Sequence, residues 1–264
     1  MTGSGLLEGR VTVVTGAERG IGAAIAGRFA AQGASVVVVV DVDEKLARKT
    51  SEAIAAQTGA VVVPEQLDVT NESSVETAAD TWIDRFGRLD CVVANAGILH
   101  LADVVDFPLD SWRRVLDVNL TGAFVTARAA ARRMIGANRG SIVFTSSLFG
   151  VRGGRENAAY SASKFGVVGL AQCLAAELAA ANIRVNSVCP GQVATDMIEK
   201  LLVDRAALTG QSRDQVLANL VSHVPMGRMA TVDEIADLFV FLASDLSSYV
   251  TGQALVVDGG WQVG

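Results

Sequence analysis

The sequence VTVVTGAERGIG, residues 11–22, joins a run of β-branched residues to a glycine-rich turn and then to an Ala-rich segment. Val and Thr favour a strand, whereas Gly16, Gly20 and Gly22 let the backbone turn tightly and approach a ligand closely. A helix that begins at this turn offers unpaired N–H groups to a phosphate. The spacing is G-x-x-x-G-x-G, not the usual G-x-G-x-x-G. The strand, turn and helix context nevertheless predicts a dinucleotide-binding turn.

The alternation of strand and helix patterns continues along the chain. Seven runs rich in Val and Ile are nearly continuous in apolar residues, which indicates strands buried on both faces of a parallel sheet. We therefore expect an α/β fold, a doubly wound single domain over residues 1–264 with a seven-stranded parallel sheet and helices on both faces. The expected helices are 20–32, 43–57, 71–86, 110–137, 158–181 and 231–243.

Composition and charge limit the possible partners and location. Half of the 264 residues are hydrophobic and 19% are charged, which supports a sizeable core. The net charge is −6 and basic residues are scattered, so neither nucleic acid nor a membrane surface is an expected partner. No apolar run approaches the roughly 18 residues of a membrane span, and the first ten residues do not resemble a secretory signal. A cytoplasmic location is expected.

Cysteine and histidine usage argues against metal chemistry. Cys91, Cys173 and Cys189 lie in hydrophobic surroundings without CxxC spacing, so we interpret them as reduced core thiols. The two histidines are His100 and His223, and the sequence contains neither H-E-x-x-H nor G-x-S-x-G. Zinc-protease and α/β-hydrolase activities therefore lack their required residues, and we expect no metal site.

A tyrosine and a lysine four residues apart, Tyr160 and Lys164, lie in the stretch AAYSASKFG. In a helix these positions share one face, so the ammonium can lie beside the phenol. A neighbouring positive charge favours the phenolate and makes proton transfer to a substrate oxygen feasible. The alternative interpretation is an amphipathic helix with Tyr and Lys on one face by coincidence.

Several short motifs occur together in one order. TGAERGIG is followed by DVT at 68–70, NAG at 95–97, Asn119 in VNLTG, Ser147 in TSS, the Tyr160 and Lys164 pair, PG at 190–191 and VDGG at 257–260. In this order and spacing the chain resembles the short-chain dehydrogenase/reductase family over essentially its whole length. The resemblance implies a Rossmann-like fold that binds a nicotinamide dinucleotide across the carboxyl ends of the strands.

The resemblance also assigns the cofactor-binding residues. The glycine turn would surround the pyrophosphate, and residues 68 and 69 would border the adenine. The 95–97 turn and the segment after PG would line the rest of the cofactor, with residues 193 and 195 at the nicotinamide amide. The assigned residues are Gly16, Arg19, Gly20, Ile21, Gly22, Asp41, Asp68, Val69, Asn95, Ala96, Gly97, Tyr160, Lys164, Pro190, Gly191, Val193 and Thr195.

Asp41 ends the second expected strand, where a carboxylate accepts from a ribose 2′-hydroxyl and repels a 2′-phosphate. This favours NAD(H) over NADP(H). Two features support NADP(H) instead. The run from Gly33 to Asp41 is one residue longer than in the family. One extra residue turns the Asp41 side chain to the opposite face of the sheet unless a bulge absorbs it. Arg19 occupies a place where a basic residue assists a 2′-phosphate in similar enzymes.

By resemblance the catalytic residues are Asn119, Ser147, Tyr160 and Lys164. Tyr160 would be the general acid/base, Lys164 would lower its pKa and hold the nicotinamide ribose, and Ser147 would bind the substrate oxygen. Asn119 would hold a water chain that leads from Lys164 to solvent. Ser146 is the alternative to Ser147.

Polar residues border the expected site, which favours a small-molecule substrate such as a polyol, sugar or hydroxyketone. The alternatives are a 3-oxoacyl-[acyl-carrier-protein] reductase, which needs a basic patch for its acidic carrier, and a dinucleotide-binding regulator without turnover. The candidate substrate residues are His100, Arg152, Asn157, Gln192 and Met197.

A helical excursion at about 194–230 follows the sixth expected strand, and Ser212 with Gln215 predicts a capping box within it. We interpret this segment as a substrate lid, with an oligomer contact as the alternative. The family resemblance also implies a homotetramer.

Overall fold

The computed structural model describes residues 5–263 and contains a seven-stranded sheet in the order β3-β2-β1-β4-β5-β6-β7. Every neighbouring pair is parallel, so the doubly wound α/β fold is confirmed. The order changes direction between β1 and β4, and ligands bind at such a switch point in open α/β sheets. The strands are β1 Val11–Thr15, β2 Val36–Asp41, β3 Val61–Gln66, β4 Cys91–Ala94, β5 Gly140–Thr145, β6 Ile183–Pro190 and β7 Ala254–Val257.

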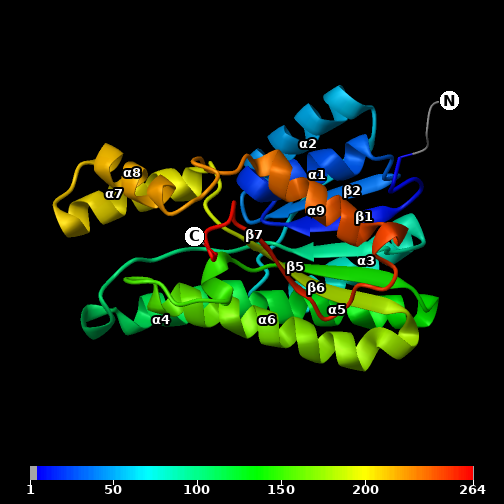
Figure 1. The fold of residues 1–264 in the computed structure, drawn as a ribbon. Helices are drawn as coiled ribbons and strands as arrows, with labels where there is room; N and C mark the ends of the chain where they lie inside the picture. Colours follow the sequence, from blue (N-terminus) through cyan, green and yellow to red (C-terminus); the bar gives the residue numbers. More distant parts are fainter. Residues whose placement is uncertain (1–4, 264) are drawn as a thin grey trace.

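Helices cover both faces of the sheet, with α1, α2 and α9 on one face and α3, α5 and α6 on the other (Figure 1). The helices are α1 Gly20–Ala31, α2 Glu44–Thr58, α3 Glu72–Phe86, α4 Leu109–Leu116, α5 Gly122–Ala137, α6 Ala158–Leu178, α7 Asp196–Thr209, α8 Arg213–Ser222 and α9 Val232–Ala243.

Residues of β2 alternate between the two apolar cores. Val38 and Val40 pack in the core under α3, α5 and α6, whereas Val37 and Val39 pack in the core under α1 and α9. The pairing of β2 with β1 is regular from Val36 onward, so no bulge interrupts these pairs. Asp41 continues the series of Val37 and Val39, which places its side chain on the α1 side of the sheet.

The helix expected at 110–137 is present, because the backbone is helical from Leu109 to Ala137, but it is not one regular α-helix. The structure divides it into α4, a π-helical turn at Asp117–Thr121, and α5. Asn119 lies inside the turn and is hydrogen-bonded to the backbone of Ile98. An i to i+5 turn is wider than an α-helical one, and such turns occur at functional sites. The contact that holds it comes from outside the helix, so periodicity did not indicate it.

The excursion at 194–230 forms α7 and α8, which extend beyond the carboxyl ends of the strands (Figure 1). The predicted capping box of Ser212 and Gln215 is confirmed at the start of α8. The pair has its own small apolar cluster, separate from the two sheet cores. Its buried members are Leu101, Leu201, Leu202, Val216 and Leu220, with Trp261 packed against them.

Two features of α6 differ from the sequence analysis. Cys91 and Cys189 are buried in strands, but Cys173 is exposed on α6, so its interpretation as a core thiol is wrong.

The second feature is the length of α6. With the short 3-10 turn that follows it, this helix spans Ala158–Ala181 and is long and apolar enough to cross a membrane by length and composition. The same helix packs along β6 and contributes Tyr160 and Lys164 to the site described below.

Candidate active site

The glycine turn after β1 closes directly onto the loop after β4. The Asn95 side-chain amide donates to the carbonyl oxygens of Thr15 and Gly16, each at 2.9 Å. The Thr15 hydroxyl in return accepts from the Asn95 N–H at 3.0 Å. A Cβ atom on Gly16, which has φ +62°, would lie 2.7 Å from the Ala96 Cα. A side chain at position 16 would therefore separate the two loops.

The first turn of α1 keeps its N–H groups free of side-chain caps. Arg19 is the N-cap residue and makes no side-chain cap hydrogen bond. Gly20 has φ +57°, and a Cβ atom on Gly22 would lie 2.2 Å from the Gly16 carbonyl oxygen. Ile21 packs against the core beneath the turn. Free N–H groups at a helix N-terminus fit the pyrophosphate of a dinucleotide.

Tyr160 lies in the first turn of α6 and faces Ser147, which follows β5. Burial raises the pKa of the Tyr160 phenol, whereas a hydrogen bond with the Ser147 hydroxyl acts in the opposite direction. The residue as a whole has intermediate exposure. A protonated phenol beside a hydroxyl group can bind and protonate a carbonyl oxygen.

Lys164 lies one helical turn after Tyr160 and is only 3% exposed. Its Nζ donates to the Thr145 carbonyl oxygen at 2.7 Å and lies 5.6 Å from the centroid of the Tyr160 ring. Burial lowers the pKa of the Lys164 ammonium to about 8. The expected closeness of ammonium and phenol is present, but the ammonium lies over the ring and its hydrogen bond goes to β5.

Ser146 and Ser147 differ sharply in their contacts. The Ser146 hydroxyl donates to the Lys164 carbonyl oxygen at 2.9 Å and is buried against Gly150. The Ser147 hydroxyl accepts from the Phe149 N–H at 3.1 Å and also faces the Tyr160 phenol. Ser146 therefore ties β5 to α6, and Ser147 is the hydroxyl placed for chemistry.

Asn119 joins this group from the π-helical turn. Its side chain bonds to both backbone groups of Ile98, and its amide also donates to the Ser163 hydroxyl at 3.1 Å. A Cβ atom on Gly97 would lie 3.4 Å from both the Asn119 Oδ1 and the Lys164 Nζ. Gly97 therefore marks the point where Asn119 and Lys164 meet.

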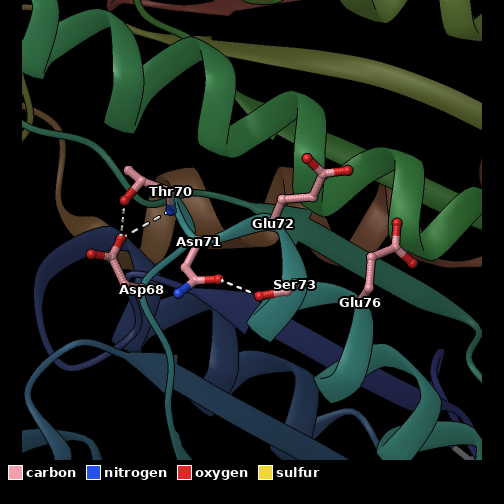
Figure 2. A pocket seen from close by; sticks show the side chains of 6 residues that line it. All are labelled: Asp68, Thr70, Asn71, Glu72, Ser73 and Glu76. Carbon is pink, nitrogen blue, oxygen red and sulfur yellow. Dashed lines mark hydrogen bonds between the residues drawn. The ribbon is translucent and has the colours of Figure 1, made fainter.

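The residues expected at the adenine lie between β3 and α3. Asp68 Oδ1 accepts from the N–H and the hydroxyl of Thr70 at 2.9 and 2.7 Å, and these bonds lower the pKa of the Asp68 carboxyl. Figure 2 shows this contact at one end of an open polar hollow. Val69 is buried and packs against Gly122 of α5. The hollow is lined by Asp68, Thr70, Asn71, Glu72, Ser73 and Glu76.

Glu18 was missed by the sequence analysis, although it lies in the glycine turn. Its side chain is 13% exposed and hydrogen-bonds to Asp41. Burial and the Asp41 carboxyl raise the pKa of Glu18 from 4.5 to about 7. Asp41 is therefore not turned away from the turn by the extra strand residue. The signal in the sequence was an acidic residue inside a turn expected to bind phosphate.

The chain after β6 returns towards the glycine turn. Gly191 follows Pro190, and its N–H donates to the Val257 carbonyl oxygen at 2.8 Å. Val193 is buried and forms a bridge with Ala230. Thr195 caps α7, and its Cγ2 would lie 3.7 Å from a Cβ atom on Gly20. The structure therefore brings the starts of α1 and α7 together.

The candidate substrate residues differ in placement. Asn157 and Gln192 are 1% and 6% exposed, and a side-chain oxygen of each has no hydrogen-bond partner among the described residues. The His100 ring lies edge-on to Phe107, with the ring centroids 5.2 Å apart. Arg152 and Met197 are exposed. Asn157 and Gln192 are thus buried polar candidates, whereas Arg152 and Met197 lie at the surface.

Comparisons with known proteins agree with this arrangement. A family model described as enoyl-(acyl carrier protein) reductase matches residues 16–262. A 3-alpha-(or 20-beta)-hydroxysteroid dehydrogenase of Mycobacterium tuberculosis is 40% identical over 261 residues, which cover 99% of this chain and 92% of that protein. A 3-oxoacyl-[acyl-carrier-protein] reductase of Thermotoga maritima is 39% identical, with 96% and 98% covered.

Polyol dehydrogenases are similar to the same degree. A D-threitol dehydrogenase of Mycolicibacterium smegmatis is 39% identical over 260 residues, which cover 97% of this chain and 94% of that protein. The solved structure of an NAD⁺-bound xylitol dehydrogenase superposes with a TM-score of 0.93 at 35% identity, covering 96% of this chain and 99% of that one.

Proposed function

Because the chain belongs to the short-chain dehydrogenase/reductase family, and is an oxidoreductase that acts on CH–OH groups, we propose that it oxidises or reduces a small hydroxylated substrate with NAD(H). The proposed substrate is a secondary alcohol or ketone of the polyol, sugar or hydroxyketone class. The observation that carries the proposal is the convergence of Tyr160, Ser147 and Lys164 at the carboxyl end of β5.

Tyr160 acts as the proton donor and acceptor in this proposal. During reduction the phenol donates its proton to the substrate oxygen, and during oxidation it accepts the proton of the substrate hydroxyl group. The Ser147 hydroxyl hydrogen-bonds the same oxygen and stabilises the charge that develops on it. The raised pKa of Tyr160 keeps the phenol protonated and ready to donate.

Lys164 and Asn119 support proton transfer. The Lys164 ammonium lies over the Tyr160 ring, but burial raises the pKa of the phenol, so the expected lowering of that pKa by Lys164 is not observed. With a pKa of about 8, Lys164 can release and regain a proton near neutral pH. Asn119 lies beside Lys164 at Gly97 and can hold water on the path to solvent.

A bound nicotinamide dinucleotide supplies the hydride chemistry. The residues that would hold its pyrophosphate are in the turn from Gly16 to Gly22, where the uncapped start of α1 fits a phosphate. Asp68 and Val69 would border the adenine, and Thr195 would meet the nicotinamide amide. Asp41 supports NAD(H) because its carboxylate repels a 2′-phosphate.

Buried polar groups support a hydroxylated substrate. Asn157 and Gln192 present oxygen atoms without partners among the described residues, and such atoms accept hydrogen bonds from hydroxyl groups. Such polar groups are less suited to a steroid skeleton, which offers mostly hydrocarbon surface. The likeness to D-threitol and xylitol dehydrogenases also supports a polyol.

The 3-oxoacyl-[acyl-carrier-protein] reductase activity is the rival function, because one such enzyme is equally similar. An acidic carrier needs unpaired basic residues beside the site. The basic residues of α7 and α8 instead pair with carboxylates, as Lys200 does with Asp204 and Arg213 with Glu199. These pairs weaken the case for a carrier.

A substrate panel tests the proposal. Purified protein would be assayed with polyols, diols, hydroxysteroids and β-ketoacyl thioesters, each with NAD(H) and NADP(H), by the absorbance of the reduced nicotinamide. We expect the highest kcat/KM with a polyol or hydroxyketone and NAD(H). Highest activity on β-ketoacyl thioesters or hydroxysteroids would contradict the proposed substrate class. Dinucleotide binding without turnover on any substrate would support the regulator alternative.

We also propose that the enzyme is a cytoplasmic homotetramer. Large apolar side chains exposed on several elements support such an assembly, because interfaces between subunits bury apolar surface. Light scattering after gel filtration would give the subunit number. A monomer would contradict the proposed assembly. The exposed apolar residues are Phe124 on α5, Phe165 on α6, and Leu246, Tyr249 and Val256 near β7.

A further inference from the structure

Two acidic side chains meet where β2 ends beside the glycine turn. The Glu18 carboxyl hydrogen-bonds to Asp41, which is the last residue of β2. The backbone fixes this position, because the Ala17 N–H donates to the Val40 carbonyl oxygen at 3.2 Å. The Thr50 hydroxyl of α2 also donates to the Glu18 carbonyl oxygen at 2.6 Å. The contact between the carboxyl groups is therefore built into the packing of the turn on β2 and α2.

The raised pKa lets Glu18 hold a proton that an isolated glutamate would lose. The side chain of Glu18 is 13% exposed, so ionising it beside the Asp41 carboxylate is unfavourable. This is consistent with a Glu18 pKa of about 7.

The charged groups that act on Glu18 come from β2 and from its own turn. Asp41 raises the pKa of Glu18, and Arg19 lowers it. The Arg19 Nε lies 3.1 Å from the Glu18 carboxylate and 3.9 Å from that of Asp196 at the start of α7. Arg19 would otherwise be the basic residue available to a 2′-phosphate. Its position between two carboxylates opposes that role.

We propose that Glu18 is a second cofactor-specificity residue, which places a second carboxyl group beside Asp41, engages Arg19, and so favours NAD(H) over NADP(H). With its proton the pair carries one negative charge and accepts from a ribose hydroxyl group. Without it the pair carries two negative charges and repels a 2′-phosphate further. The inference rests on the proposed use of a nicotinamide dinucleotide.

Fluorescence titration of the purified protein with NADH and NADPH tests the pair. Dissociation constants would be measured at about pH 6 and about pH 8.5 for the natural protein and for Glu18→Gln, whose amide mimics the protonated carboxyl. The quantity compared is the dissociation constant for NADPH divided by that for NADH. Between the two pH values, we expect this ratio to rise by a factor roughly ten times larger in the natural protein than in Glu18→Gln. The Gln side chain of Glu18→Gln cannot titrate, so this variant reports the titration of the 2′-phosphate itself.

Glu44→Gln is the matched control. It removes one carboxylate from the neighbouring α2, where Glu44 is exposed and pairs with Arg48. At about pH 8.5, above the Glu18 pKa of about 7, the net charge change is therefore the same as in Glu18→Gln. We expect this control to keep the pH dependence of the natural protein.

Thermal unfolding without a dinucleotide provides a second readout. Because the pKa of Glu18 is raised on folding, the folded state binds more protons, and stability falls as the pH rises from about 4.5 to about 7. Glu18→Gln lacks this loss. The melting temperature of the variant should therefore increase relative to the natural protein over that range, and Glu44→Gln should not show this increase.

The outcomes separate the two proposals. The natural protein could prefer NADH while its binding and its unfolding show the same pH dependence as in Glu18→Gln. That result would overturn the role of the pair and leave the proposed function intact. Failure to bind either dinucleotide would overturn both. Tighter binding of NADPH at both pH values would overturn NAD(H) selection, whatever the unfolding data show.

Discussion

The Asn119 side chain is clamped to both backbone groups of Ile98, because its Oδ1 accepts from the Ile98 N–H at 2.8 Å and its Nδ2 donates to the Ile98 carbonyl oxygen at 3.0 Å. Asn119 is 1% exposed and lies in the π-helical turn between α4 and α5. An amide is suited to this position, since it offers a donor and an acceptor at once. The clamp fixes the loop after β4 against the helix that follows it.

Asn119→Ala should therefore lower stability as well as activity. The change leaves both Ile98 backbone groups without their partner, which costs about 2 kcal/mol of unfolding free energy. Chemical denaturation would measure the loss. Ser163→Ala is the control, because it leaves the clamp on Ile98 in place and removes the third bond of the Asn119 side chain, together with the bond from the Ser163 hydroxyl to the Tyr160 carbonyl oxygen. If the two variants are equally stable, the clamp does not hold the π-helical turn.

Tyr160→Phe should leave dinucleotide binding nearly unchanged and lower kcat by at least about 100-fold, as is typical when a positioned acid/base is removed. The ring stays in place and only the proton donor is lost. Fluorescence titration and steady-state kinetics on the same preparation would separate the two effects. Turnover close to that of the natural protein would remove Tyr160 from the mechanism.

The neighbouring serines should respond differently to alanine. Ser147→Ala should lower kcat with little change in melting temperature, because its hydroxyl faces the Tyr160 phenol. Ser146→Ala should lower the unfolding free energy by about 1 kcal/mol, because it breaks the buried bond to the Lys164 carbonyl. The reverse pattern would make Ser146 the catalytic hydroxyl.

Lys164→Met should abolish most turnover without a comparable loss of stability. The pKa of Lys164 falls from 10.5 to about 8 on folding, so the folded state binds fewer protons and the buried ammonium is destabilising below about pH 8. The natural protein should gain stability relative to the variant as the pH rises from 8 to 10.5. Thermal unfolding across this range would measure the difference, and a large loss of stability in the variant at neutral pH would contradict it.

The proposed lid should depend on one half-buried ion pair. The Arg205 Nε of α7 lies 3.0 Å from the Glu156 carboxylate, which precedes α6, and the side chains are 19% and 14% exposed. Arg205→Met should speed hydrogen exchange in α7 and raise KM. Arg213→Met, which breaks an exposed pair with Glu199, is the matched control.

Exchange in α7 and α8 should also slow when NAD and a good substrate are added, because a lid is ordered by its ligands. Equal protection with and without ligands would mean that these helices are a fixed part of the fold.

The sequence by itself determined the elements and their class. Runs of Val around β1 and β2, the glycine turn and the Ser212 capping signal are local patterns, since each depends on residues a few positions apart. The order of motifs along the chain also indicated which side chains gather at the carboxyl edge of the sheet.

The tertiary structure decided the contacts within that edge. Asn119 meets Ile98, Glu18 meets Asp41, and Glu156 meets Arg205. Each pair joins residues from different elements, so its contact depends on strand order and on how loops pack across the sheet. The pKa values of Glu18 and Lys164 depend on the same packing, because burial sets the free energy of a charge and no local pattern specifies burial of a single polar side chain.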